Sequence, residues 1–341
     1  MFNNSSKILF LLTLMSGTLI TISSTSWLSA WMGLEINLLS FIPLMNDSSN
    51  LMSTETSLKY FLTQAIASSI FLAAVLISML KINLMNFQLI YYPNMLITTA
   101  LLIKSGTAPF HFWFPSIMEG LNWTNSIILM TWQKIAPLIL VSYIFISNLM
   151  YFVIIISTIT GAIGGLNQTS LRKLMAFSSI NHLSWMLAAM MHSSSTFIMY
   201  FIFYSFLSIT VIFLLNSFKI FHFNQLFTSF SSYSPLKFSF FINLLSLGGL
   251  PPFLGFLPKW IVIQNLTNIN QMSLMLVLIL FSMVTLYFYL RICYSAFMIG
   301  NSEFNWNLIM FQNNKFLNKM ILMSFISTMG LSFISLIYFF I

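Results

Sequence analysis

Charged residues are scarce in this chain. Of its 341 residues, only 5% are Asp, Glu, Lys or Arg, while 58% are hydrophobic and 17% are aromatic. About a quarter of the residues in soluble domains carry charge, so this composition excludes a soluble fold. The apolar runs repeatedly reach the length of a bilayer-spanning helix, and the alternating ten-residue segments of a membrane β-barrel are missing. We therefore expect an all-α integral membrane protein.

Cysteine occurs once, as Cys293. One thiol cannot form an internal disulfide, a Cys-ligated iron–sulfur site or a zinc-finger cluster. The sequence also lacks metal-ligand spacing, a glycine-rich dinucleotide fingerprint and a P-loop, so we expect no metal or cofactor in this chain. The small residues at 161–165 (GAIGG) indicate close helix packing instead. The net charge of +8 comes mostly from single basic residues and does not favour nucleic acid as a partner.

Eleven apolar stretches are long enough to cross a membrane, and they predict one membrane-embedded domain over residues 1–341. The first stretch follows Lys7 without the small-residue cleavage site of a signal peptide, so we expect it to be retained as a span. The predicted spans are 7–23, 26–45, 58–80, 94–114, 124–146, 150–167, 173–191, 196–217, 237–267, 271–297 and 320–341.

The basic residues predict the orientation of these spans. If the N-terminus lies on side A, the connections on side B carry only Lys81. Side A carries Lys7, Lys59, Arg172, Lys173, Lys219, Lys237, Lys315 and Lys319. Because Lys and Arg favour the cytoplasmic or matrix side, side A is assigned to that compartment. The C-terminus is then expected on the opposite side.

Glycine and proline interrupt two of the predicted spans. The fourth contains KSGTAP at 104–109, and the ninth contains LGGLPPFLGFLPK at 247–259. Proline removes a backbone donor and glycine permits unusual turns, so we expect unwound segments near 105–108 and 246–252. The freed carbonyl groups must face protein or water.

The positions of these breaks indicate an internal repeat. Spans one to five (7–146) and spans six to ten (150–297) each carry a discontinuous, lysine-bearing helix in fourth place. Because five is odd, the second set enters the membrane from the opposite face. This arithmetic predicts two inverted five-helix repeats, which are common in transporters, with 320–341 as an extra C-terminal helix.

Three lysines lie inside apolar spans, close to a proline or glycine. They are Lys104, Lys134 and Lys259. A lysine at the bilayer centre costs roughly 2.5–3.5 kcal/mol on insertion scales, so three cost on the order of 10 kcal/mol. Such a cost points to movement of charge or protons across the membrane. The alternative roles are snorkelling toward the interface, or a polar anchor between helices.

One carboxylate, Glu35, is clearly inside a span. A buried carboxylate without a partner would stay protonated, whereas a lysine beside it would favour ionisation and couple the two titrations. We expect Lys104 to be its partner, with a protonated structural Glu35 as the alternative. His182, among polar neighbours in the middle of a span, is a further candidate for proton relay, and His111 after Pro109 is a weaker one.

These motifs resemble the antiporter-like membrane-arm subunits of respiratory Complex I, in their mitochondrially encoded form. The resemblance rests on KSGTAPFHFWFP at 104–115, TWQKIAP at 131–137 and GGLPPFLGFLPKW at 248–260. It implies that Glu35 is the partner of the broken-helix Lys104, that Lys134 is the central linking lysine, and that Lys259 belongs to the second broken helix. His182 lies in the region of the relay histidine. Full-length members have fourteen core helices, so this chain is expected to lack three.

The resemblance also implies a cellular setting. It predicts a proton-translocating, non-redox subunit of NADH:ubiquinone reductase in the mitochondrial inner membrane, with the N-terminus in the matrix and the C-terminus in the intermembrane space. NADH, FMN, iron–sulfur clusters and ubiquinone would bind partner subunits. Neighbouring antiporter-like subunits and lipids such as cardiolipin would be partners. A stand-alone cation/proton antiporter of the same fold and a structural scaffold are the rival interpretations.

Overall fold

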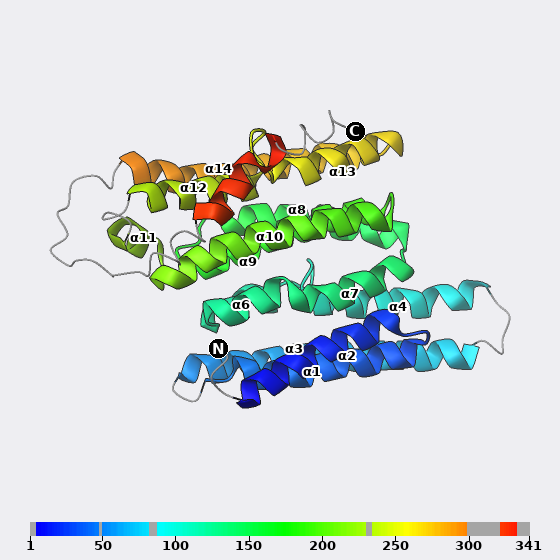
Figure 1. The fold of residues 1–341 in the computed structure, drawn as a ribbon. Helices are drawn as coiled ribbons and strands as arrows, with labels where there is room; N and C mark the ends of the chain where they lie inside the picture. The colour runs from blue at the N-terminus through cyan, green and yellow to red at the C-terminus, as the bar shows by residue number, and fades with distance from the viewer. Residues whose placement is uncertain (1–4, 48–49, 82–86, 230–233, 299–320, 333–341) are drawn as a thin grey trace. The chain divides into compact units, whose positions relative to one another are not determined.

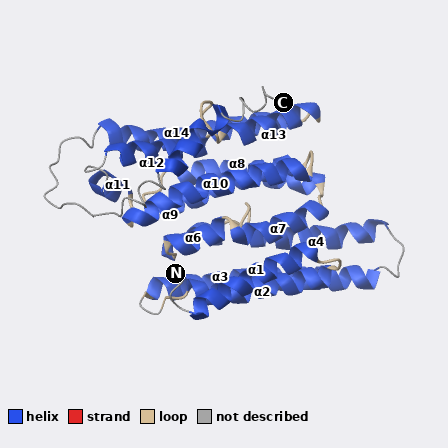
Figure 2. Cartoon of the chain, in the orientation of Figure 1, coloured by secondary structure: helices blue, strands red, loops and turns tan. Residues whose placement is uncertain are grey.

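The computed structural model describes residues 5–47, 50–81, 87–229, 234–298 and 321–332 (Figure 1). Every named secondary-structure element in these ranges is a helix (Figure 2). The β contact between Ser170 and His222 is an isolated bridge and not part of a strand. A helix satisfies its backbone polar groups internally, as a bilayer requires. The all-helical prediction is therefore confirmed for the described part of the chain.

Seven helical segments within the described ranges are long and apolar enough to cross a membrane. The α6–α7 pair counts as one of them. They are α1 (Ser5–Ser23), α2 (Trp27–Met45), α3 (Leu51–Lys81), α6 (Trp123–Met130) with α7 (Trp132–Tyr143), α8 (Ser147–Gly165), α10 (Ser194–Phe218) and α14 (Met272–Met298).

The remaining helices are shorter or more polar. Four of them form two pairs, the first at the predicted fourth span and the second at the predicted ninth span. They are α4 (Phe87–Ser105) with α5 (Trp113–Gly120), and α12 (Ser234–Gly248) with α13 (Phe256–Asn268). Helix α9 (Leu171–Met190) fills the predicted seventh span, and α11 (Phe223–Ser229) lies in the connection predicted as a loop. Of the last predicted span, 320–341, the structure describes the apolar helix Ile321–Ser332.

The chain divides into two compact units, residues 1–153 and 154–341. In the first unit, α3 packs against α2, α4 and α5, and α1 packs along α2. Two glycines allow α1 and α2 to approach closely. A Cβ on Gly33 would lie 2.9 Å from the backbone nitrogen of Thr21, and one on Gly17 would lie 3.1 Å from the carbonyl oxygen of Gly33. Small residues are a common means of bringing membrane helices together.

Asp47, just after α2, ties together one end of the first unit. Its carboxylate accepts hydrogen bonds from Lys7 (3.2 Å) and from the side-chain amide of Asn122 (2.5 Å). The hydroxyl of Ser53 donates to the Asp47 carbonyl oxygen over 3.0 Å. These contacts join the start of α1 and the start of α3 to the connection between α5 and α6.

The predicted span over 124–146 is present as α6 and α7, and the structure interrupts it at Thr131. The Thr131 hydroxyl donates to the carbonyl oxygen of Ile127, a contact that tends to bend helices. Pro137 lacks the N–H that would bond the Gln133 carbonyl and crowds that carbonyl. The interruption places Lys134 in the first turn of α7.

In the second unit, α9 is the central helix, since nearly all its side chains are buried and it packs against α10, α13 and α14. The small residues of α8 do the packing that the sequence predicts. A Cβ on Gly161 would lie 2.7 Å from the backbone nitrogen of Asn181, and one on Gly165 would lie 2.9 Å from the Phe288 ring. Helix α8 therefore approaches α9 at backbone distance.

Candidate functional site

The first helix break holds Lys104 in the last turn of α4. Gly106 adopts a φ of 74°, which a residue with a side chain resists. The N–H groups of Gly106 and Thr107 both donate to the Leu102 carbonyl oxygen, over 3.1 and 3.2 Å. This αL cap ends the helix and leaves the Lys104 ammonium near its C-terminal end, where the helix dipole favours positive charge.

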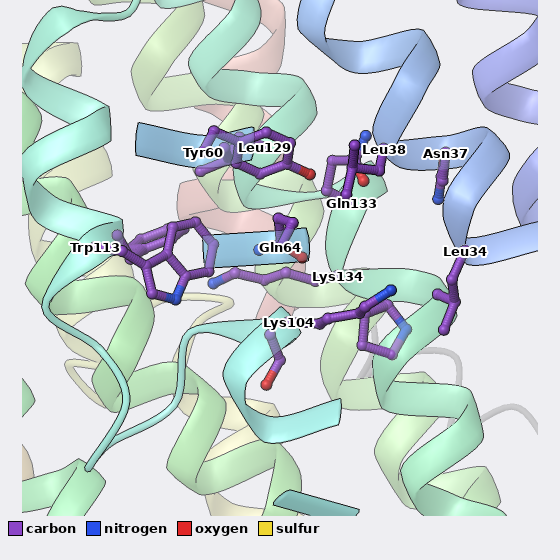
Figure 3. A pocket seen from close by; sticks show the side chains of 13 residues that line it. Leu34, Asn37, Leu38, Tyr60, Gln64, Lys104, Trp113, Leu129, Gln133 and Lys134 are labelled. Carbon is purple, nitrogen blue, oxygen red and sulfur yellow. The ribbon is translucent and has the colours of Figure 1, made fainter. Parts of the chain in front are cut away.

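Lys104 and Lys134 line the same cavity in the first unit (Figure 3). Their exposed fractions are 7% and 2%, so neither side chain snorkels to the surface of the unit. The Lys134 nitrogen lies 4.9 Å from the centre of the Phe114 ring, a cation–π distance. Asn37, Gln64 and Gln133 add polar side chains to the cavity wall. The structure thus brings together two of the three lysines singled out in the sequence.

Glu35 lies on α2, one residue from Leu34 and two from Asn37 in the cavity wall, and its side chain is half-buried. Glu35 and Lys104 do not form an ion pair within 4 Å. Salt bridges elsewhere in the described part of the chain include Lys7–Asp47 and Lys59–Glu55. The structure therefore shows no direct ion pair for the predicted partnership of Glu35 with Lys104.

The second break lies between α12 and α13, and α12 ends at an αL glycine in the same way as α4. Gly249 has a φ of 82°, and its N–H donates to the carbonyl oxygens of Leu245 and Ser246 over 3.1 and 3.0 Å. Lys259, in the first turn of α13, donates from Nζ to the Gly248 carbonyl oxygen over 2.8 Å. The lysine therefore caps the C-terminal end of α12 from across the break.

The two breaks differ in where the lysine is attached. Lys104 precedes the αL glycine of its break, whereas Lys259 follows it and reaches back. Lys259 is 5% exposed, and its nitrogen lies 5.8 Å from the ring of Trp185 on α9. A side chain at Gly249 would occupy the place of the lysine, because a Cβ there would lie 2.9 Å from Nζ. Both breaks nevertheless hold an amine against the end of a half-helix.

His182 is buried on α9, and two tyrosines of α10 flank it. Its Nδ1 lies 3.0 Å from the hydroxyl of Tyr200, and its ring centre lies 5.1 Å from that of Tyr204. Trp185, one helical turn further along α9, contacts Lys259. In the second unit, α9 thus carries both the candidate histidine and the aromatic neighbour of the candidate lysine.

His111 lies in the first break, and its side chain is mostly buried. Its ring stacks on Phe112 with a centre-to-centre distance of 4.5 Å. It does not line the cavity that holds Lys104 and Lys134. The structure therefore places this weaker candidate within the break but outside the lining of the lysine cavity.

Several polar residues of these sites were not singled out in the sequence. The amides Asn37, Gln64 and Gln133 come from α2, α3 and α7, and Tyr200 comes from α10. A signal existed for the amides, because each is an uncharged polar residue inside an apolar span. Across the described ranges, no group of three or more His, Cys, Asp or Glu residues could hold a metal ion. The amines, amides and imidazole of these sites can exchange and orient protons.

Comparison with known proteins identifies the family. The family model for the membrane region of NADH:quinone oxidoreductases and Mrp antiporters matches residues 24–285, and the model for the C-terminus of NADH dehydrogenase subunit 2 matches 286–338. NADH-ubiquinone oxidoreductase chain 2 of Aedes aegypti is 58% identical and that of Anopheles gambiae 56% identical, each over 97% of both chains.

A solved structure of respiratory complex I from Thermus thermophilus contains a chain with the same fold. The TM-score is 0.81 at 20% identity, covering 97% of this chain and 79% of that one. The chain therefore belongs to the NADH-ubiquinone oxidoreductase chain 2 family, within the wider group of NADH:quinone oxidoreductase and Mrp antiporter membrane proteins.

Proposed function

We propose that this chain is a proton-translocating membrane-arm subunit of respiratory Complex I. The single observation that carries the proposal is the burial of Lys104 and Lys134 around one cavity within a membrane-helix bundle. Burial of an amine away from water costs free energy, so a buried lysine in a membrane helix indicates a functional role. Such a lysine can exchange a proton with a neighbouring group. The family membership supports the same function.

The proposed relay uses the candidate residues in two groups. In the first unit, Glu35 biases the protonation of Lys104, which exchanges protons with Lys134. In the second unit, Lys259 at the helix break and His182 beside Tyr200 continue the relay. His111 is a minor candidate at the first break. The position of Glu35 next to Leu34 of the cavity wall and the contact of Lys259 with the Gly248 carbonyl support these roles.

The proposed topology is eleven membrane spans in two inverted five-helix repeats with an extra C-terminal helix. The matching αL glycines, Gly106 and Gly249, support a repeat, because each ends the first half of a broken helix. We place the chain in the mitochondrial inner membrane. The N-terminus faces the matrix and the C-terminus faces the intermembrane space, as the distribution of Lys and Arg indicates.

The proposed partners are the other membrane-arm subunits, including neighbouring antiporter-like subunits, and membrane lipids such as cardiolipin. NADH, FMN, iron–sulfur clusters and ubiquinone bind partner subunits in this proposal, so the chain contributes to the reductase without a complete active site of its own. Comigration of the native chain with NADH dehydrogenase activity in a mild-detergent gel tests this assignment. Migration apart from that activity would contradict it.

A stand-alone cation/proton antiporter is the alternative function, and the wider family includes Mrp antiporters. Sodium and other hard cations prefer oxygen ligands, whereas the cavity of the first unit is lined by two amines. The extent of the match to chain 2 sequences, 97% of both chains, also favours the Complex I subunit. A purely structural scaffold would leave the buried lysines without a role.

Substitution of Glu35 by Gln is expected to slow proton pumping and coupled ubiquinone reduction about fivefold, while the complex still assembles. The neutral amide removes the negative charge that biases the protonation of Lys104 in the proposed relay. An interaction on the order of 1 kcal/mol changes an equilibrium by about this factor. Pumping into vesicles and ubiquinone reduction would be measured on equal amounts of assembled complex.

Glu55→Gln is the matched control, because Glu55 is exposed and pairs with Lys59 on the surface. It should leave both rates unchanged. Full pumping by the assembled Glu35→Gln complex would count against the partnership of Glu35 with Lys104.

A further inference from the structure

The apolar helix Ile321–Ser332, drawn in red in Figure 1, contacts both sides of the second helix break. The hydroxyl of Ser327 donates a hydrogen bond to Oδ1 of Asn243 on α12. The carbonyl oxygen of the same serine accepts a hydrogen bond from the backbone N–H of Leu254 over 3.2 Å. Leu254 lies between α12 and α13, two residues before α13 begins. One residue therefore joins the first half of the broken helix to the start of the second.

The break leaves the backbone N–H of Leu254 without a partner in a helix of its own. In a membrane-helix bundle, such a group must bond within the protein. A carbonyl oxygen has two acceptor sites, so that of Ser327 can accept this N–H as well as a bond within its own helix. The side chains of Asn243 and Ser327 are 1% and 0% exposed, so solvent at the surface of the unit does not compete for the contact between them.

The side chain of Leu254 is held by the same helix. A Cβ on Gly330, three residues after Ser327, would overlap the end of the Leu254 side chain. Leu254 is 5% exposed, and it occupies the space that a side chain at Gly330 would need. The helix Ile321–Ser332 therefore fixes both the backbone and the side chain of one residue in the break.

The two points held by Ser327 flank the contact that Lys259 makes. Asn243 lies five residues before Gly248, whose carbonyl oxygen accepts the hydrogen bond from Lys259, and Leu254 lies five residues before Lys259 itself. Lys259 belongs to α13 and reaches back to the end of α12. Its 2.8 Å hydrogen bond therefore requires a fixed separation of the two half-helices. Ser327 bonds to both sides and stabilises that separation.

We propose that Ser327 is a positioning residue for Lys259, because it holds the two halves of the second broken helix at the separation that the lysine contact requires. This inference rests on the proposed function, in which Lys259 belongs to the proton relay. The helix that supplies Ser327 lies within residues 286–338, which match the model for the C-terminus of NADH dehydrogenase subunit 2. The helix that the proposed topology leaves outside both repeats therefore stabilises the break of the second one.

The test compares two substitutions of Ser327 in the assembled complex. Ser327→Ala removes the hydroxyl and should slow proton pumping and coupled ubiquinone reduction about fivefold, the factor by which an ordinary hydrogen bond changes an equilibrium. Ser327→Thr keeps the hydroxyl and should pump faster than the alanine variant. A role in close packing alone predicts the opposite order, since alanine is the smaller residue at a position that is 0% exposed. Pumping by the threonine variant no faster than by the alanine variant would overturn the proposal.

Ser324→Ala is the matched control. Ser324 is a buried serine one turn earlier on the same helix, and its hydroxyl donates to the Ile321 carbonyl oxygen of that helix over 2.8 Å. Its replacement leaves the contacts of Ser327 with Asn243 and Leu254 in place and should not change the pumping rate. A slowing equal to that in Ser327→Ala would overturn the positioning role.

Hydrogen–deuterium exchange of the assembled complex measures the break itself. In Ser327→Ala, the backbone amides of residues 246–254 should exchange about fivefold faster, because local opening no longer has to break the bond to Asn243. The Ser324→Ala complex should exchange at the rate of the unaltered complex. Unchanged exchange of this segment in Ser327→Ala would contradict the proposal.

Asn243→Leu removes the other partner of the same hydrogen bond, and it decides the question should Ser327→Thr fail to assemble. The double variant with Ser327→Ala should pump no more slowly than the slower of the two single variants, because both substitutions break one bond. Effects that multiply in the double variant would show that the two residues act separately and would overturn the proposal.

Lys259→Met separates this inference from the proposed function. Loss of pumping in Lys259→Met, together with a normal rate in Ser327→Ala, would overturn the positioning role of Ser327 alone. Full pumping in Lys259→Met would overturn the role of Lys259 in the proposed relay, on which the positioning role depends.

Discussion

Lys104→Met is expected to abolish coupled turnover, with a fall in proton pumping of at least about 100-fold. Methionine keeps the length and apolar stem of the lysine but has no proton to exchange. The residue is 7% exposed and shares its cavity with Lys134, so lysines on the protein surface cannot take over its proton exchange. Pumping and ubiquinone reduction would be measured in vesicles that contain equal amounts of assembled complex.

Lys104→Arg separates charge from proton exchange. Arginine retains the positive charge but does not release its proton in proteins, so this variant should be nearly as inactive as the methionine variant. Lys59→Met is the matched control, because Lys59 belongs to the same unit but is exposed and pairs with Glu55. Normal coupled activity in Lys104→Arg would show that Lys104 never needs to lose its proton.

The helix breaks were predictable because their causes are local. The predicted unwound segments, 105–108 and 246–252, overlap the observed gaps between α4 and α5 and between α12 and α13. The observed gaps lie slightly later because each helix continues until a glycine takes positive φ. Gly106 and Gly249 are those residues. Glycine and proline act on their own backbone, so the sequence carries this information directly.

The burial of the lysines was also predictable, since the cost of insertion depends on apolar neighbours in sequence. The partners of the lysines were not. Gln64 lines the same cavity as Lys104 and Lys134, which lie 40 and 70 positions further along the chain, because α3 packs against α4 and α4 packs against α7. Lys259 contacts the Gly248 carbonyl only because the chain turns back through the break. Side-chain neighbours of this kind are a result of tertiary packing, which local patterns do not specify.

The interruption at Thr131 was only partly predictable from the sequence. Pro137, the last residue of the TWQKIAP segment, lacks the N–H that would bond the Gln133 carbonyl, and this can be read from the sequence. The structure interrupts the helix further toward the N-terminus, where the Thr131 hydroxyl bonds the Ile127 carbonyl. A threonine in a helix can bond its own backbone or point away from it, and packing decides between the two. The sequence therefore indicated a disturbed helix but not its position.

The geometry of the second break depends on the absence of a side chain at Gly255, and Gly255→Ala is expected to disrupt it. Gly255 precedes α13, and a Cβ there would overlap the Ser246 carbonyl oxygen. That oxygen also accepts the hydrogen bond from Gly249, which ends α12. The two half-helices would have to move apart, which costs about 1–3 kcal/mol. Lys259 would then lose its contact with the Gly248 carbonyl.

Gly248→Ala, in the same break, is the matched control. A Cβ on Gly248 would meet first the Tyr289 ring at 3.3 Å, a side-chain atom, and the backbone of Gly248 does not have positive φ. Alanine is favoured over glycine in a helix by up to about 1 kcal/mol, so this variant should assemble normally. Gly255→Ala should reduce the assembled complex, lower its melting temperature and reduce pumping in what remains. Equal melting temperatures and pumping rates for the two variants would show that the close approach of Gly255 to Ser246 does not hold Lys259 in place.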